Sequence, residues 1–206
     1  MKAFFTAVLI VFALMNGFSQ VGYGLTTSYD FYQYFANPED GTGESRTAGS
    51  AFLNFGVGPK LWFGGEDFSF SVEGQVSLGT LGFSAGDYKG LGIASVPLMA
   101  KLNFNGLSSF DKEGKFGWSV GGGLQYSRTE LYYLANDFED IGGERSWFKT
   151  YIGQVGYGFG MTGFNGQGYL RGGYNSETKA CIATVGIQVD FNFGKLKEID
   201  DPASRL

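Results

Sequence analysis

The chain has 206 residues, a formal net charge of −5 and no histidine. It contains no basic block that could meet a phosphate backbone, which argues against nucleic-acid binding. The lack of histidine excludes imidazole-dependent metal sites and catalytic dyads, and the single cysteine, Cys181, excludes an intrachain disulfide framework. The 35 glycines and many aromatic residues, with only 4 prolines, favour strands and tight turns over helices.

Residues 1–19 have the composition of an export signal. Lys2 gives a positive start, Phe4 to Leu14 form a short apolar core, and small residues precede Gln20. This core is shorter than the roughly 18–20 apolar residues that a membrane helix needs, and no later run reaches that length. We therefore expect a signal peptide that is cleaved after Ser19; the alternative is an uncleaved anchor.

After this segment, apolar residues recur at every second position in runs separated by glycine- and acid-rich gaps. A period of two places alternate side chains on opposite faces of a strand. Several runs exceed the 5–6 residues of an ordinary strand and suit the 9–11 residues of a tilted membrane-crossing strand. The alternation predicts eight strands, over about 21–35, 50–63, 68–78, 95–104, 116–126, 147–159, 168–174 and 181–193.

The last run shows the pattern most clearly. Its odd positions are all apolar: Cys181, Ala183, Val185, Ile187, Val189, Phe191 and Phe193. The connections alternate too, being mostly short after the second, fourth and sixth strands and longer after the first, third and fifth. Transmembrane barrels with periplasmic termini have this arrangement, and closure leaves no unpaired edge in lipid. We expect an all-β, eight-stranded antiparallel up-and-down transmembrane β-barrel over 20–194 and a polar periplasmic tail over 195–206.

Aromatic residues gather near the expected strand ends, as in the interfacial girdles of outer-membrane barrels. They are Tyr29, Phe31, Trp62, Phe63, Phe104, Trp118, Trp147, Phe191 and Phe193.

The other face of each strand would line a narrow lumen, because an eight-stranded barrel is only wide enough for side chains to fill it. Its charges are few and balanced: Asp30, Lys60, Glu73, Lys101, Arg171 and Asp190. Burying an unpaired charge is costly, so we expect a structural cluster of salt bridges and hydrogen bonds. Lys60, Lys101 and Asp190 should lie toward the periplasmic end, with Glu73 somewhat above them. The alternative is a narrow polar path or a small-ligand pocket.

Residues 95–104, Ser-Val-Pro-Leu-Met-Ala-Lys-Leu-Asn-Phe, resemble a recurring strand of the PorT-type outer-membrane β-barrel family of Bacteroidetes. That pattern is roughly Ile/Val-Pro-Leu-Leu-x-Lys-Tyr-x-Phe, and Leu102 stands where tyrosine is common. Residues 171–174, Arg-Gly-Gly-Tyr, are similar to the family's penultimate strand. The resemblance spans about 20–194 and implies an eight-stranded outer-membrane barrel, but no reaction. One departure is the tail after Phe193, since many such barrels end on an aromatic residue.

Two motifs with catalytic or metal-binding associations have simpler interpretations. Residues 82–86, Gly-Phe-Ser-Ala-Gly, match the spacing of a nucleophile elbow, but no helix follows and the chain has no histidine base. The carboxylate and amide side chains of the longest expected loop could supply calcium ligands, although their spacing is not that of an EF-hand and a solvated surface is the simpler interpretation. They are Asn136, Asp137, Glu139, Asp140 and Glu144.

We therefore expect a non-enzymatic outer-membrane protein with no cofactor and no metal. Its expected role is that of a structural or accessory subunit of an envelope complex, and the resemblance adds a secretion-related role as one option. The expected partners are outer-membrane lipid, lipopolysaccharide and an envelope protein complex, and not nucleic acid. Two alternatives stay open: a narrow channel or small-ligand-binding barrel, and a secreted soluble barrel of lipocalin type.

Overall fold

The computed structural model describes residues 20–38, 47–65, 67–84, 90–108, 115–133, 147–161 and 163–198. No helix within these ranges is long and apolar enough to cross a membrane. The expected signal peptide and the acidic residues 136–144 lie outside the described residues. The strands are β1 (Gln20–Asn37), β2 (Thr47–Gly64), β3 (Phe68–Gly74), β4 (Val76–Ser84), β5 (Gly90–Asn105), β6 (Phe116–Tyr133), β7 (Phe148–Met161), β8 (Phe164–Tyr174) and β9 (Cys181–Glu198).

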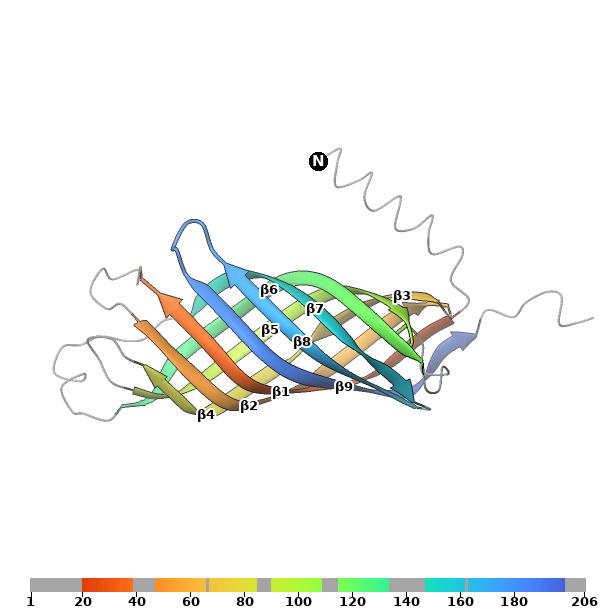
Figure 1. The fold of residues 1–206 in the computed structure, drawn as a ribbon, viewed down its shortest axis with the longest axis horizontal. Helices are drawn as coiled ribbons and strands as arrows, with labels where there is room; N and C mark the ends of the chain where they lie inside the picture. Colours follow the sequence, from red (N-terminus) through yellow and green to blue (C-terminus); the bar gives the residue numbers. More distant parts are fainter. Residues whose placement is uncertain are drawn as a thin grey trace, which may run out of the picture.

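These strands form one antiparallel sheet that closes on itself (Figure 1). Strands pair in chain order, except that β3 and β4 share one position between β2 and β5, and β1 pairs with both β2 and β9 to complete the ring. The predicted all-β, antiparallel up-and-down barrel is therefore confirmed. We call the end with the β2–β3, β5–β6 and β7–β8 connections the turn end, and the opposite end the loop end; in Figure 1 they lie at the right and the left.

The third predicted strand is divided into β3 and β4 at Gln75. Both pieces pair with β2 and with β5, so they share one position in a ring of eight. The break lies opposite Pro97 on β5, which has no N–H to donate across the sheet. One contact persists there, because the Gln75 N–H donates to the Pro97 carbonyl at 3.0 Å. The division therefore follows from the missing N–H of Pro97, and the pairing with β2 and β5 continues on both sides of it.

β1 and β2 each carry one extra residue at the same level of the barrel. Phe31 and Leu53 are left out of the pairing between the two strands, and Leu53 has a φ of 58°. An extra residue shifts the alternation of all later side chains by one position. Phe35 and Ala51 consequently face inward and are buried. Ala51 and Leu53 therefore lie on opposite faces of β2 although they are two residues apart.

The two faces of the wall differ in chemistry as the alternation predicts. Large apolar side chains stand exposed on the outside of every strand, for example Val155 at 54% and Leu170 at 60%. Serine, threonine, asparagine, glutamine and charged side chains turn inward and are buried. The barrel is thus apolar outside and polar inside, the reverse of a water-soluble protein.

Aromatic rings form a continuous belt on the outer wall near the turn end. Phe68, Phe104, Trp118 and Tyr157 stand opposite one another on β3, β5, β6 and β7. The Phe68 and Phe104 ring centroids lie 5.2 Å apart, and those of Phe104 and Trp118 stack at 4.0 Å. Trp62 was wrongly assigned to this belt: it is 2% exposed and faces into the lumen.

Several strands run further than the alternation indicated. β6 continues through Glu130 to Tyr133, β5 begins at Gly90, and β8 begins at Phe164. β9 continues to Glu198, so three of the first four residues of the expected polar tail, Lys195, Lys197 and Glu198, are paired with β1. Backbone pairing extends these ends where the side-chain pattern fades, because the ladder needs only N–H and C=O groups.

Gly58 shows how closely neighbouring backbones approach beside the β3–β4 break. A Cβ at Gly58 would overlap the Gly74 carbonyl oxygen and lie 2.7 Å from the Gln75 Cα. We expect Gly58→Ala to lower the free energy of unfolding by about 1–3 kcal/mol, because backbone atoms would have to move. The matched control is Gly172→Ala, where a Cβ would meet nothing within 4 Å. Chemical denaturation of both variants tests this, and equal stabilities would contradict it.

Candidate functional site

All six charged residues of the expected lumen cluster lie inside the barrel. All six residues are buried, and the most accessible of them, Arg171, is only 5% exposed. The wall places them there because each occupies an inward position of its strand. They are Asp30 on β1, Lys60 on β2, Glu73 on β3, Lys101 on β5, Arg171 on β8 and Asp190 on β9.

Four of the six form two ion pairs near the turn end. Lys60 Nζ lies 2.5 Å from Asp190 Oδ2, and Lys101 Nζ lies 2.5 Å from Glu73 Oε1. Both pairs are almost completely buried, where the loss of hydration is offset only by close partners. Lys60 and Glu73 are directly paired across β2 and β3, which brings the two ion pairs next to each other.

Gln188 on β9 links these two ion pairs, and the sequence analysis did not single it out. Its Oε1 accepts a hydrogen bond from Lys101 Nζ at 2.7 Å. Its Nε2 lies within hydrogen-bond distance of Asp190 Oδ1 (2.7 Å) and Glu73 Oε2 (3.1 Å). One neutral amide thus connects both carboxylates to one ammonium group. The only signal in the sequence was its inward position in the last run.

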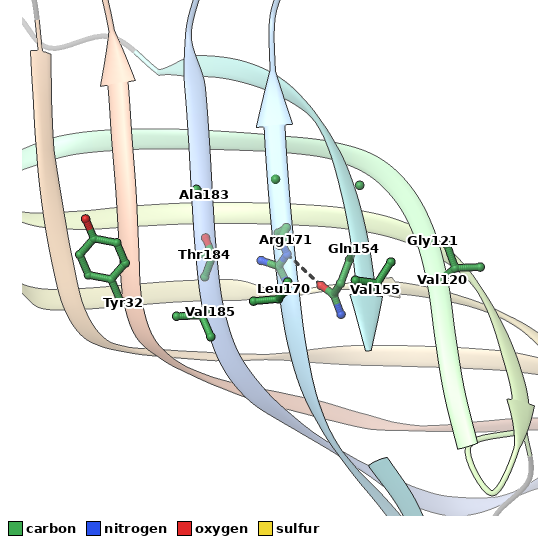
Figure 2. A pocket seen from close by; sticks show the side chains of 12 residues that line it. Tyr32, Val120, Gly121, Gln154, Val155, Leu170, Arg171, Ala183, Thr184 and Val185 are labelled. Atoms are coloured by element: carbon green, nitrogen blue, oxygen red, sulfur yellow. Dashed lines mark hydrogen bonds between the residues drawn. The ribbon is translucent and has the colours of Figure 1, made fainter. Parts of the chain in front are cut away.

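The remaining two charges, Asp30 and Arg171, do not form a direct ion pair. The Tyr169 hydroxyl donates to Asp30 Oδ1, and the Arg171 guanidinium carbon lies 5.0 Å from the centroid of the Tyr169 ring. Arg171 Nε donates to Gln154 Oε1 at 2.9 Å, and Nη1 to Gln125 Oε1 at 3.5 Å. Figure 2 shows the first of these bonds. Arg171 is therefore held by amides and an aromatic ring.

Apolar side chains fill the lumen between this layer and the loop end. This apolar cluster was not expected inside a polar lumen. Two signals were available: Ile182 and Ile152 interrupt the polar faces of their strands. Met99 occupies a regular inward position of β5, and the others entered through the shifted alternation of β1 and β2 or from positions near strand ends. The cluster comprises Phe35, Ala51, Ile93, Met99, Phe148, Ile152, Ala180 and Ile182.

A further buried carboxylate, Glu130, lies near the loop end of β6. The sequence analysis placed it in a loop. It is 2% exposed, has a φ of 52°, and accepts hydrogen bonds from Thr129 Oγ1 at 2.9 Å and Thr47 Oγ1 at 3.3 Å. The irregular φ turns an end-of-strand residue inward, which side-chain alternation cannot reveal.

The outer wall has a shallow apolar depression where small residues face outward (Figure 2). Its volume is about 570 Å³. Gly153, Gly172 and Ala183 stand opposite one another on β7, β8 and β9 and form its floor, with Val155 and Leu170 beside them. The outward face of β8 thus carries a glycine, Gly172, where most strands carry a large apolar side chain.

The chemistry available in the described lumen is that of paired charges and amides. The elbow-like serine, Ser84, ends β4, while Ala85 and Gly86 lie outside the described residues. Within the described part of the chain, no group of three or more acidic or cysteine side chains could hold a metal ion. The arrangement can bind and orient hydrogen-bonding groups, and it fills the space that a solute would cross.

No protein-family model matches the chain, and no curated protein matches it. Solved structures do. Neisserial surface protein A is 14% identical with a TM-score of 0.45, covering 84% of this chain and 97% of that one. Ail, the attachment invasion locus protein of Yersinia pestis, is 11% identical with a TM-score of 0.46, covering 85% and 99%. Outer membrane protein OprG from Pseudomonas aeruginosa is 11% identical with a TM-score of 0.41, covering 83% and 94%.

At these identities and scores the likeness carries no argument about function. The assignment of the fold rests on the strand pairing within this chain, which forms a closed ring. What the described residues form is an antiparallel barrel with an apolar exterior, two buried ion pairs at one end of its lumen and an apolar cluster toward the other.

Proposed function

We propose that the chain is a non-enzymatic outer-membrane β-barrel protein that serves as a structural or accessory subunit of a cell-envelope complex. One observation carries the proposal: the exposed face of every strand is apolar, while the charged and amide side chains are buried inside. In water this arrangement would expose apolar surface on all sides. In lipid it satisfies every backbone group and exposes only hydrocarbon.

Strand length and aromatic placement support a membrane location. β7 has 14 residues and β9 has 18, beyond the 9–11 that a tilted strand needs to cross a bilayer. The aromatic belt at the turn end has the position of an interfacial girdle. A secreted lipocalin-type barrel would place its polar face outward, so the exposed apolar band speaks against that alternative.

The proposed orientation places the turn end and both termini in the periplasm. Short connections face the periplasm in barrels of this kind, and both described chain ends lie at the turn end. An export signal over 1–19 and contact with lipopolysaccharide at the loop end complete the proposal. The resemblance of 95–104 to PorT-type strands of Bacteroidetes supports a place in that family, and with it a secretion-related role.

The filled lumen favours a structural role over a channel. Trp62 is buried at the turn end, followed by the two ion pairs, the Arg171 layer and the apolar cluster. Each layer contains fully buried side chains, so a hydrated ion would have to displace several at once. A narrow channel or small-ligand barrel is the second candidate, favoured only by the polar lining.

We expect the purified barrel to insert into planar lipid bilayers without producing discrete conductance steps. The reason is that side chains from opposite walls meet across the lumen, as between Lys101 on β5 and Gln188 on β9. A known porin in the same bilayers provides the positive control. Reproducible single-channel steps from the wild-type protein would favour the channel.

Membrane location has its own test, independent of conductance. The protein should partition with the outer-membrane fraction and migrate faster on gels when it is not boiled, since a closed barrel resists unfolding by detergent. Recovery in the soluble fraction would contradict the proposal. Extraction in mild detergent followed by identification of co-purifying proteins tests the envelope complex, and a barrel that is recovered alone would leave an accessory role without support.

A further inference from the structure

A row of inward polar side chains follows the wall just below the apolar cluster. Gln33 on β1 stands opposite Thr184 on β9, Thr184 opposite Arg171 on β8, and Arg171 opposite Gln154 on β7. Side chains directly opposite in antiparallel strands have Cβ atoms about 4.5–5.5 Å apart. These four side chains therefore lie side by side in one row along the wall.

Three neighbours in this row carry a buried hydrogen-bonding atom that has no partner among the described residues. The atoms are Gln33 Nε2, Thr184 Oγ1 and Arg171 Nη2. Each side chain is at most 5% exposed. Buried polar atoms are nearly always satisfied, and an unsatisfied one costs about 1–3 kcal/mol. Three unsatisfied atoms on adjacent strands are better explained by one shared ligand than by three independent defects.

All three atoms can donate a hydrogen bond, and the two amides of the row have fixed orientations. Asn54 Nδ2 donates to Gln33 Oε1 at 2.8 Å, which leaves Gln33 Nε2 as the unused end. Gln154 Oε1 accepts from Arg171 Nε at 2.9 Å, which turns the guanidinium group in place. In Figure 2, Arg171 lies between Thr184 and Gln154. Three unused donors are therefore available in neighbouring positions of one row.

The charge on this level also calls for a negative ligand. Within the described ranges no carboxylate lies within 4.0 Å of Arg171, whereas Lys60 and Lys101 each have one. Asp30, one level toward the turn end, accepts from the Tyr169 hydroxyl instead. Arg171 has no carboxylate at ion-pair distance, so an anion beside its guanidinium group would be stabilised there.

The row above is apolar, since Phe35 stands opposite Ile182 on the loop-end side. Such a layer excludes water and disfavours ions that hold their hydration shell strongly. We propose that Gln33, Thr184 and Arg171 form a binding site for one small monovalent anion of halide size in the middle of the lumen. This site goes beyond the proposed function and does not depend on whether the barrel is structural or conducting.

The site can be tested with bromide as the probe on the intact barrel folded in detergent micelles. Bromide replaces gluconate at constant ionic strength, and the unfolding midpoint is followed by the heat-induced shift in gel mobility. We expect a saturable rise of roughly 2–4 °C, because a ligand that binds only the folded state stabilises it. Sulfate should give no saturable rise. Crystals grown with bromide should show an anomalous peak within hydrogen-bond distance of Arg171 and Thr184.

Variants separate this site from general salt effects. Thr184→Val removes one donor at similar volume and should weaken apparent bromide affinity about tenfold. Arg171→Gln should abolish the saturable rise. Asp30→Asn should strengthen affinity about tenfold, because it removes the nearest negative charge. Lys179→Gln, an exposed cation at the loop end, should change nothing.

The outcomes are decisive in both directions. A bromide peak at the row, with opposite responses of Thr184→Val and Asp30→Asn, would support the site. A water molecule in that position in bromide-grown crystals would overturn it. An equal, non-saturating salt response of the wild type and Thr184→Val would overturn it too, even if Arg171→Gln failed to fold.

Discussion

Replacing Lys101 with methionine is expected to lower the free energy of unfolding by about 3–5 kcal/mol. The substitution keeps the chain length but removes the ammonium group that lies 2.5 Å from Glu73 Oε1 and 2.7 Å from Gln188 Oε1. Glu73 would remain as an uncompensated charge in a lumen from which water is largely excluded. Urea unfolding of the barrel in micelles, followed by tryptophan fluorescence, measures the loss.

Two variants test the physical reason for this loss. Lys179→Met removes a cation that is exposed at the loop end, and such surface changes usually stay within about 0.5 kcal/mol. The double variant Lys101→Met with Glu73→Leu should recover much of the stability, because replacing both partners of a buried pair by apolar groups is often neutral. A single Lys101→Met variant as stable as Lys179→Met would contradict the role of the ion pair.

Replacing Leu170 with arginine is expected to impair folding into lipid bilayers by about 2–4 kcal/mol. Leu170 lies in the middle of β8, is 60% exposed, and stands between Val155 and Val185 on the neighbouring strands. In the proposed membrane location an arginine there would enter the hydrocarbon core. Urea titration of the barrel in liposomes measures the change in the free energy of folding.

The size of this effect distinguishes a membrane barrel from a soluble one. In a soluble protein, exchanging an exposed leucine for arginine is close to neutral. The matched control is Tyr174→Arg, at the loop end of the same strand, where the cost should fall to about 0–1 kcal/mol. Equal and negligible effects at the two positions would contradict the membrane location.

The architecture followed closely from side-chain alternation in the regular strands. In β9, Val185 and Ile187 are exposed while Thr184 and Gln188 are buried, as a period of two requires. The prediction failed where an irregular residue interrupts the period. The irregular residue Leu53, with its positive φ, turns Ala51 inward. The prediction for Trp62 was wrong because a tryptophan near a strand end is usually part of an interfacial girdle, whereas this one is buried.

The candidate site was only partly accessible from the sequence. The alternation of side chains along each strand was enough to place all six charged residues inside the barrel. It could not reveal which of them meet, because Lys60 and Asp190 are separated by 130 positions in the chain. Nor could it identify Gln188 as their link, or show that Arg171 faces Tyr169 and amides in place of a carboxylate.

By itself, the sequence determined that this protein builds long amphipathic strands, because period-two alternation assigns each side chain a face before any contact is made. The tertiary structure decided the level at which each inward group lies and therefore its partners. Those levels depend on how β1 registers against β2 and β9 when the ring closes, including the extra residues Phe31 and Leu53. Such registers arise from pairings between distant segments, which no local pattern contains.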